Sequence, residues 1–114
     1  MQKYKKYYQV ILKMEKLTEE RLKKYIEITA KAIDKVKIKK EGQIDSWEYT
    51  AEDFFDMARR YYDDALYFRK NGRDVDAFAA VNYAHGWLDA GARIGLFDVD
   101  GDNTLFTVDK KWNN

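Results

Sequence analysis

Cysteine and proline do not occur in this 114-residue sequence, and histidine and serine occur once each, as His85 and Ser46. The lack of cysteine excludes disulfides, a thiolate nucleophile and a zinc-thiolate site, and it fits a protein of the reducing cytoplasm. A single histidine excludes a metal site built from several histidines. A lone serine in a predicted loop makes a Ser-His-Asp enzyme hard to build. We therefore expect no metal, no cofactor and no catalytic residue.

Long hydrophobic runs are also missing. Near the N-terminus, the uncharged run YYQVIL has only Val10, Ile11 and Leu12 as aliphatic residues, which is too short for the apolar region of a signal peptide. No run approaches the roughly 20 apolar residues that a membrane helix needs. The sequence thus predicts a cytoplasmic protein that has no membrane partner.

Charge of both signs is abundant but unevenly distributed. The sequence is 46% hydrophobic, 16% aromatic and 36% charged, which is typical of one globular domain. Residues 1–40 hold 12 lysines, Arg21 and five acids, a net charge of +8, whereas residues 41–114 hold eight bases and 15 acids, a net charge of −7. The basic segment either packs beside acidic helices, the interpretation we favour, or presents a lysine-rich surface to RNA or another polyanion.

Apolar residues recur every three or four positions in four segments, as they do in amphipathic helices. The first segment, within residues 1–17, is a basic, tyrosine-rich extension that we expect to dock on the rest of the chain or on a second copy. The other three run from Thr18 to about Lys40, from Thr50 to Lys70 and from Asp74 to Ile94. The short connection at Asn71-Gly72 makes the last two helices antiparallel neighbours.

Residue types that cap helices mark the ends of these segments. Thr18, Thr50 and Asp74 stand where N-cap side chains are expected. Asn71-Gly72 and Gly95-Leu96 suit C-terminal caps, which often need a residue in the left-handed conformation. Residues 39–49 are polar and show no clear period, so they are predicted to form a loop.

After the last helix the pattern changes to two short alternations, LFDV and LFTV, around the turn-rich DGDN. This pattern predicts a β-hairpin over residues 96–108. The stretch from Asp98 to Thr104 also places acids at alternate positions, as calcium loops do. However, its glycine comes two positions too early and Asp109 replaces the usual glutamate, so we interpret the stretch as a turn.

Together these features predict a mainly α protein. Its core would be a three-helix bundle made of an antiparallel helical hairpin and a long first helix. An N-terminal helical extension and a short C-terminal β-hairpin would be added to that core. Residues 18–114 would then form a single domain.

The predicted helix over residues 74–94 has an apolar face that covers well over half of its circumference. This face is widened by Ala79, Tyr83, Gly86, Trp87 and Ala90, which predicts a central helix packed on several sides. A glycine inside a helix costs about 1 kcal/mol relative to alanine. Gly86 and Gly91 are therefore expected to allow the close approach of a neighbouring helix or a ligand.

A narrow polar arc remains on that helix, formed by Asn82, His85, Asp89 and Arg93. The spacing of four residues lets the Asp89 carboxylate bridge the histidine ring and the arginine. The arc is either a ladder of structural contacts or a binding site for a ligand or partner. These four residues are our candidate binding residues.

The sequence also resembles a known family. The run from Ala51 to Val99 contains YFRKNGRDVDAFAAVNYAHGWLDAG and leads into GLFDVDGD, and RLKKYIEITAKAIDKVKI precedes it from Arg21. These stretches resemble a family of small archaeal proteins described as domain of unknown function 357, over about Arg21 to Val108. The resemblance implies an archaeal, cytoplasmic and mainly helical protein, and it brings no established activity.

Three functions remain open. We favour a non-enzymatic binding or assembly module that uses the polar face of the 74–94 helix to bind a protein partner or a second copy. The alternative is nucleic-acid or nucleotide binding through the lysine-rich N-terminal helices. A weaker third hypothesis is a hydrolase that uses His85 and Asp89.

Overall fold

The computed structural model describes residues 16–39 and 45–109. Its elements in chain order are α2 (Glu19–Lys35), β1 (Lys37–Ile38), α3 (Asp45–Lys70), α4 (Asp74–Arg93) and β2 (Phe97–Asp98). The predicted N-terminal extension, residues 1–17, lies outside the described residues except for Lys16 and Leu17. Its predicted docking lies outside them as well.

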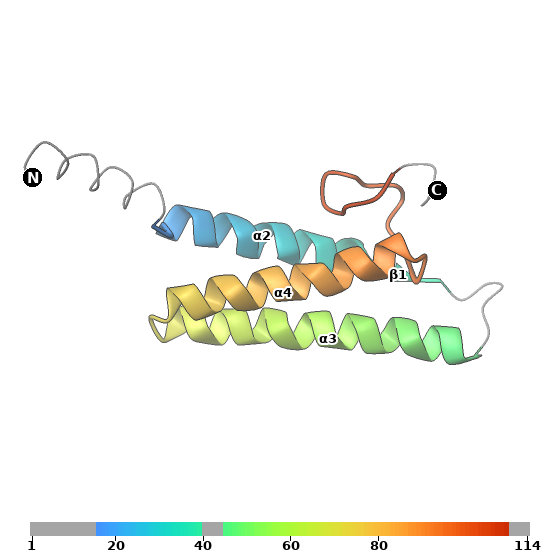
Figure 1. Cartoon of the computed structure of the whole chain (residues 1–114), viewed down its shortest axis with the longest axis horizontal. Coiled ribbons are helices and arrows are strands. Elements are labelled where there is room, and N and C mark those ends of the chain that lie inside the picture. The colour runs from blue at the N-terminus through green and yellow to red at the C-terminus, as the bar shows by residue number, and fades with distance from the viewer. Residues whose placement is uncertain (1–15, 40–44, 110–114) are drawn as a thin grey trace, which may run out of the picture.

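The three helices form a bundle, and the fold is mainly α, as the sequence predicted. Figure 1 shows α3 and α4 as an antiparallel hairpin, with α2 running along α4 in the same direction. α2 packs mainly against α4 and less extensively against α3. None of the helices within the described ranges is both long and apolar enough to cross a membrane.

Caps at the helix ends largely follow the sequence prediction. The Thr18 hydroxyl accepts a hydrogen bond from the Arg21 N–H at 3.0 Å and so caps α2. α4 ends in a Schellman motif, in which the Leu96 N–H donates to the Gly91 carbonyl at 2.8 Å and Gly95 has a φ of +86°. Asp74, predicted as the N-cap of α4, is instead its first helical residue.

Two helix boundaries predicted from the sequence are wrong. α2 ends at Lys35 instead of Lys40, because the backbone becomes extended at Val36 and continues into β1. α3 begins at Asp45, so Thr50 lies inside the helix and does not cap it. The predicted loop over residues 39–49 is therefore wrong for residues 45–49, where Trp47 begins the apolar stripe that continues through Ala51 and Ala58.

A short two-stranded antiparallel sheet is present, but its strands are not those of the predicted hairpin. Phe97 in β2 pairs with Ile38 in β1, and Asp98 pairs with Lys37. The chain after β2 passes through turns and bends up to Thr107 and forms no second strand. The predicted hairpin over residues 96–108 is wrong in its pairing, since the partner strand follows α2.

The core consists of two clusters along the bundle. In the first, near the α3–α4 connection, Leu22 and Ile26 of α2 pack with Ala65 of α3 and Ala77 of α4. The second lies at the other end and joins the helices to residues 99–109, which we call the C-terminal segment. Its buried residues include Ala32, Ile33, Ala58, Leu88, Ala92, Leu96, Phe97, Val99, Phe106 and Val108. The C-terminal segment is thus part of the folded domain.

Candidate functional site

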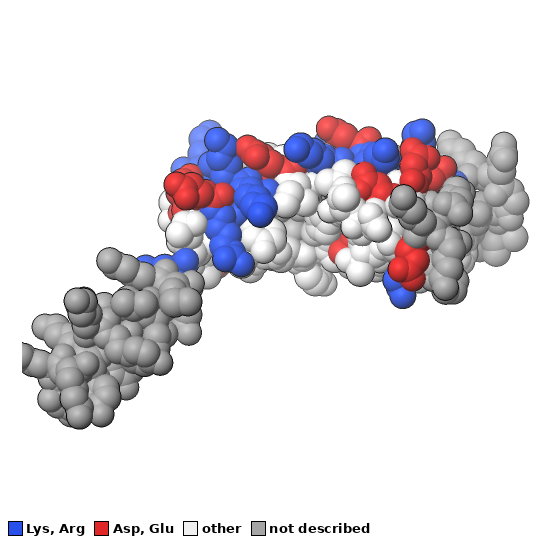
Figure 2. Space-filling view, turned by 90° about the horizontal axis from the view of Figure 1, so that it is seen from above, with Lys and Arg blue, Asp and Glu red and all other residues white. Residues whose placement is uncertain are grey.

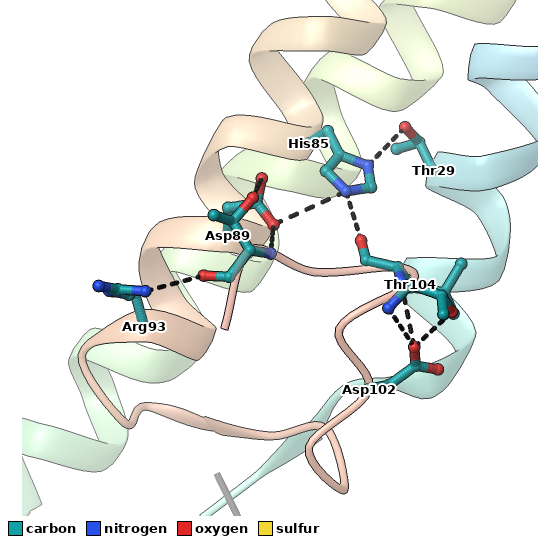
Figure 3. Close-up of polar contacts among 8 residues, drawn as sticks. Thr29, His85, Asp89, Arg93, Asp102 and Thr104 are labelled. Atoms are coloured by element: carbon teal, nitrogen blue, oxygen red, sulfur yellow. Dashed lines mark hydrogen bonds and ion pairs between the residues drawn. The ribbon is translucent and has the colours of Figure 1, made fainter. Parts of the chain in front are cut away.

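The predicted polar arc of α4 lies where α2 and the C-terminal segment meet this helix. Figure 3 shows the His85 ring between Thr29 of α2 and the backbone of the C-terminal segment, with Asp89 and Arg93 farther along α4. The arc residues therefore do not form a row of contacts on an uncovered helix surface. The contacts of each residue show what the arc does within the chain.

Both ring nitrogens of His85 have partners. Nε2 lies 2.7 Å from the Leu105 carbonyl oxygen, which can only accept, so Nε2 carries a hydrogen and donates it. Nδ1 lies 2.9 Å from the hydroxyl of Thr29; in the neutral ring it accepts, and the hydroxyl donates. Thr29 is 2% exposed, so this hydroxyl depends on the histidine for its hydrogen bond.

Asp89 binds the same segment two residues farther on. Its Oδ1 accepts a hydrogen bond from the Thr107 N–H at 2.9 Å, and its Oδ2 accepts one from the Thr107 hydroxyl at 3.2 Å. The His85 Nε2 lies 3.8 Å from Oδ1, at the outer limit of an ion pair. The carboxylate therefore holds Thr107 more closely than it holds the histidine.

The other two residues of the arc lie at the surface. Arg93 directs Nη1 to the Thr107 carbonyl oxygen at 3.5 Å, and Asn82 donates to the Phe78 carbonyl of its own helix at 2.9 Å. Both residues are exposed. The arc thus divides into His85 and Asp89, which hold the C-terminal segment, and Asn82 and Arg93, which border solvent.

Sequence reasoning missed the partners of this arc. Thr29 lies at helical spacing between Ile26 and Ile33 on the apolar side of α2, and Thr107 lies in the LFTV alternation that predicted a strand. A hydroxyl in the middle of an apolar stripe is a usable sign, because a buried hydroxyl needs a hydrogen-bond partner. No comparable feature of the sequence marks Leu105, which contributes only its backbone carbonyl.

The acidic stretch after β2 forms a turn stabilised by its own side chains. Oδ1 of Asp102 accepts hydrogen bonds from the Thr104 N–H at 3.0 Å, the Thr104 hydroxyl at 2.6 Å and the Leu105 N–H at 3.1 Å. These bonds, above all the one from the Thr104 hydroxyl, lower the pKa of Asp102, while partial burial opposes the shift. Within residues 16–39 and 45–109, no three His, Asp or Glu side chains are grouped to hold a metal ion.

α4 also presents an exposed apolar surface, which the sequence interpretation had placed in contact with other helices. Val75 is 74% exposed, Tyr83 is 52% exposed and Ile94 is 53% exposed. We call this surface the outer face of α4; it consists of Val75, Ala79, Tyr83, Gly86, Ala90 and Ile94, all of them exposed. α4 packs against α2, α3 and β2, as predicted, but the residues of its outer face remain exposed.

The two helical glycines of α4 have different surroundings. A Cβ placed on Gly91 would overlap the ring of Phe97, reaching 2.6 Å from its Cδ2 atom. Close approach is therefore confirmed at Gly91, but the neighbour is the Phe97 side chain of β2 and not a helix or a ligand. A Cβ placed on Gly86 meets no described atom within 4 Å, so residues 16–39 and 45–109 provide no close neighbour there and the expectation stays a prediction.

Basic side chains gather at one end of the bundle. Figure 2 shows that Lys and Arg side chains predominate over the first turns of α2 and the adjoining bundle end, with acidic side chains among them, while the other end is more evenly mixed. Arg21, Lys23 and Lys24 are exposed there. Some charge is compensated between elements, since Arg69 lies 3.1 Å from Glu19.

Comparison with known proteins places the chain in a family. The family model described as Protein of unknown function (DUF357) matches residues 24–97, nearly two thirds of the chain. No curated protein and no solved structure gives a significant match. The match covers most of α2 and all of α3 and α4, and it ends at Phe97, so the resemblance drawn from the sequence is confirmed. The chain therefore belongs to the family described as Protein of unknown function (DUF357).

Proposed function

We propose that this protein is a cytoplasmic, archaeal, non-enzymatic binding or assembly module whose binding surface is the outer face of α4. Asn82 and Arg93, the exposed members of the polar arc, border this face and would form its polar rim. His85 and Asp89 would support the surface by fixing the C-terminal segment. The observation that carries the proposal is the exposure of large apolar side chains along the whole length of α4.

A helix that is apolar almost all round normally has partners on all sides. α4 buries Ala77, Val81, Ala84 and Leu88 completely. On the outer face the ring of Tyr83 contacts the ring of Tyr61 in α3, with ring centroids 4.4 Å apart, and still remains half exposed. The members of the outer face are uncharged and follow each other every three or four residues from Val75 to Ile94, with charges only at its ends, Asp76 and Arg93. A continuous exposed apolar surface of this kind is typical of a protein-binding site.

The geometry at His85 does not favour the hydrolase hypothesis. The Leu105 carbonyl and the Thr29 hydroxyl take up both ring nitrogens, and Thr107 takes up both oxygens of Asp89. A general base must reach the proton that it removes. Here the C-terminal segment would have to leave before a substrate could reach the ring.

Affinity capture with purified protein tests the proposal. The native chain and the variants Ala90→Arg and Asn103→Arg would each serve as bait in an extract of the source cells. Ala90→Arg places a charge on the outer face of α4, whereas Asn103→Arg places the same side chain on an exposed turn elsewhere. We expect partners that are retained by the native chain and by Asn103→Arg but lost with Ala90→Arg. Equal retention by all three would contradict the proposal.

Polyanion binding is a second candidate, favoured by the basic end of the bundle in Figure 2. Its surface would consist of Arg21, Lys23 and Lys24, with Arg73 stacked on Phe68 at 4.7 Å. Binding of labelled single-stranded RNA should then fall steeply with added salt and should weaken in Lys23→Glu but not in Ala90→Arg. Failure of the native chain to bind RNA at low salt would eliminate this candidate.

A further inference from the structure

We infer that the outer face of α4 binds the same face of a second copy of this chain, with the two α4 helices antiparallel about a two-fold axis beside Gly86. The inference rests on the proposed function, because it names the partner of the surface assigned there. Gly86, the size pattern of the face and its charge pattern support it.

Gly86 is the first argument. Glycine is unfavourable in the middle of a helix, and nothing described in the chain lies within 4 Å of the position where its Cβ would be. Gly91 on the same helix shows what such a residue permits, since the Phe97 ring occupies the space of its missing side chain. At Gly86 residues 16–39 and 45–109 supply no such neighbour. A second α4 crossing at this point would approach the backbone closely.

The order of large and small residues along the face is the second argument. In an antiparallel pair centred between positions 86 and 87, residues whose numbers add up to 173 lie opposite each other. Ile94 then faces Ala79 of the second copy, Tyr83 faces Ala90, and Gly86 lies beside Gly86. Tyr83 and Ile94 thus each meet a small residue, the self-complementarity that a two-fold symmetric interface requires, whereas Val75 would extend beyond the end of the second α4.

Charge is the third argument. A symmetric interface brings identical surfaces together, so charges of one sign near its centre would repel each other. On the outer face of α4, charged residues occur only at the two ends, where Asp76 and Arg93 share the helical angles of Ile94 and Val75. At its ends, Arg93 of one copy would lie at the axial level of Ala80 in the other, about 6 Å along the axis from Asp76, which also pairs with Arg73 of its own chain at 2.7 Å. The acidic start of one α4 thus lies near the basic end of the second, and the helix dipoles oppose each other.

Analytical ultracentrifugation of the full chain tests self-association. We expect a reversible monomer–dimer equilibrium between micromolar and millimolar concentrations. The variant Gly86→Arg leaves the monomer intact, because its side chain enters open space, and it should weaken the dimer by about tenfold or more. Asn103→Arg is the matched control and should dimerise like the native chain. Equal dimerisation of Gly86→Arg would overturn the location of the interface.

Cysteine cross-linking tests the direction of the pair, because the chain has no cysteine of its own. In the antiparallel pair, position 79 lies opposite position 94, while two copies of position 79 are separated by about 22 Å along the axis, too far for a disulfide. A mixture of Ala79→Cys and Ile94→Cys chains should therefore form mixed disulfides faster than either variant alone forms its own. Faster cross-linking of each variant with itself would indicate a parallel pair and overturn the inference.

The two proposals can fail separately. A chain that is monomeric at all concentrations overturns self-association. If partners in the affinity capture still depend on Ala90, the proposed binding function survives with a different partner. If capture is also insensitive to Ala90→Arg, both proposals fail.

Discussion

The hydroxyl of Thr29 in α2 and the Nδ1 atom of His85 in α4 lie 2.9 Å apart, although 56 positions separate the two residues in the chain. The second ring nitrogen reaches the Leu105 carbonyl at 2.7 Å. One imidazole thus connects α2, α4 and the C-terminal segment. This arrangement explains why a partly buried histidine lies beside an otherwise apolar interface.

Removing the ring should loosen all three elements. His85→Ala leaves the Thr29 hydroxyl and the Leu105 carbonyl without these bonds, and an unpaired buried polar group costs about 1–3 kcal/mol. We expect the free energy of unfolding in urea to fall by that amount and hydrogen exchange at Thr107 to accelerate. Asn82→Ala is a suitable control, because Asn82 lies on the same helix and binds only its own helix backbone. If His85→Ala and Asn82→Ala have the same free energy of unfolding and the same hydrogen exchange at Thr107, the ring does not hold the C-terminal segment.

The two glycines of α4 form a natural matched pair. Gly86→Ala should raise the free energy of unfolding by about 0.5–1 kcal/mol, because alanine favours the helix and the added Cβ enters open space. Gly91→Ala should lower it by about 1 kcal/mol or more, because the Phe97 ring, which is fully buried, would have to move in a packed core. Urea denaturation at low protein concentration, where self-association does not contribute, measures both effects. Equal effects would contradict the difference in their surroundings.

Local chemistry was enough to predict most of the helical framework. The Thr18 cap and the left-handed Gly95 follow from residue types within one turn of the chain, and helical periodicity located α4 to within one residue at each end. The start of α3 was missed because its first turns are polar, and Trp47 was not recognised as the beginning of the apolar stripe. A residue type that favours an N-cap does not by itself start a helix. Thr50 is such a residue, but it lies inside α3.

The C-terminal segment could not be predicted in the same way, because contacts distant in sequence determine it. The alternation in LFTV predicts a strand, but Asp102 binds the backbone of Thr104 and Leu105 and turns the chain back toward α4. The four arc residues were identified from helical spacing alone. Their partners depend on how the C-terminal segment crosses the bundle, which no local pattern specifies.

Calcium should not bind measurably to the acidic turn at micromolar concentrations. Oδ1 of Asp102 accepts three hydrogen bonds, and Oδ1 of Asp98 accepts one from the Asp100 N–H at 3.0 Å. A calcium ion needs six to eight oxygen ligands, so these bonds would have to break first. Isothermal titration calorimetry with calcium should show only dilution heat. Micromolar binding would show that the turn rearranges into a metal site.

The pH dependence of stability should report on Asp102. Its pKa is lowered in the folded protein, first of all by the Thr104 hydroxyl, whereas an aspartate in the unfolded chain titrates at about pH 4. A group whose folded pKa is lowered stabilises the fold above its unfolded pKa, and this contribution is lost as the pH falls through the folded pKa. We therefore expect Asp102→Asn to be less stable than the native chain near neutral pH, and the difference to shrink as the pH falls below about 4.

Two further variants separate this effect from a general change of charge. Asp64→Asn removes the same charge from an exposed position of α3 and corrects for the altered net charge. Thr104→Ala removes the hydroxyl donor but keeps the backbone N–H groups that Asp102 accepts from. Because the hydroxyl is the largest cause of the shift, Thr104→Ala should remove part of the acid dependence that Asp102→Asn removes. Denaturation in urea from neutral pH to pH 2 measures all three. An acid dependence that is the same in Thr104→Ala as in the native chain would show that the hydroxyl does not stabilise the charged carboxylate.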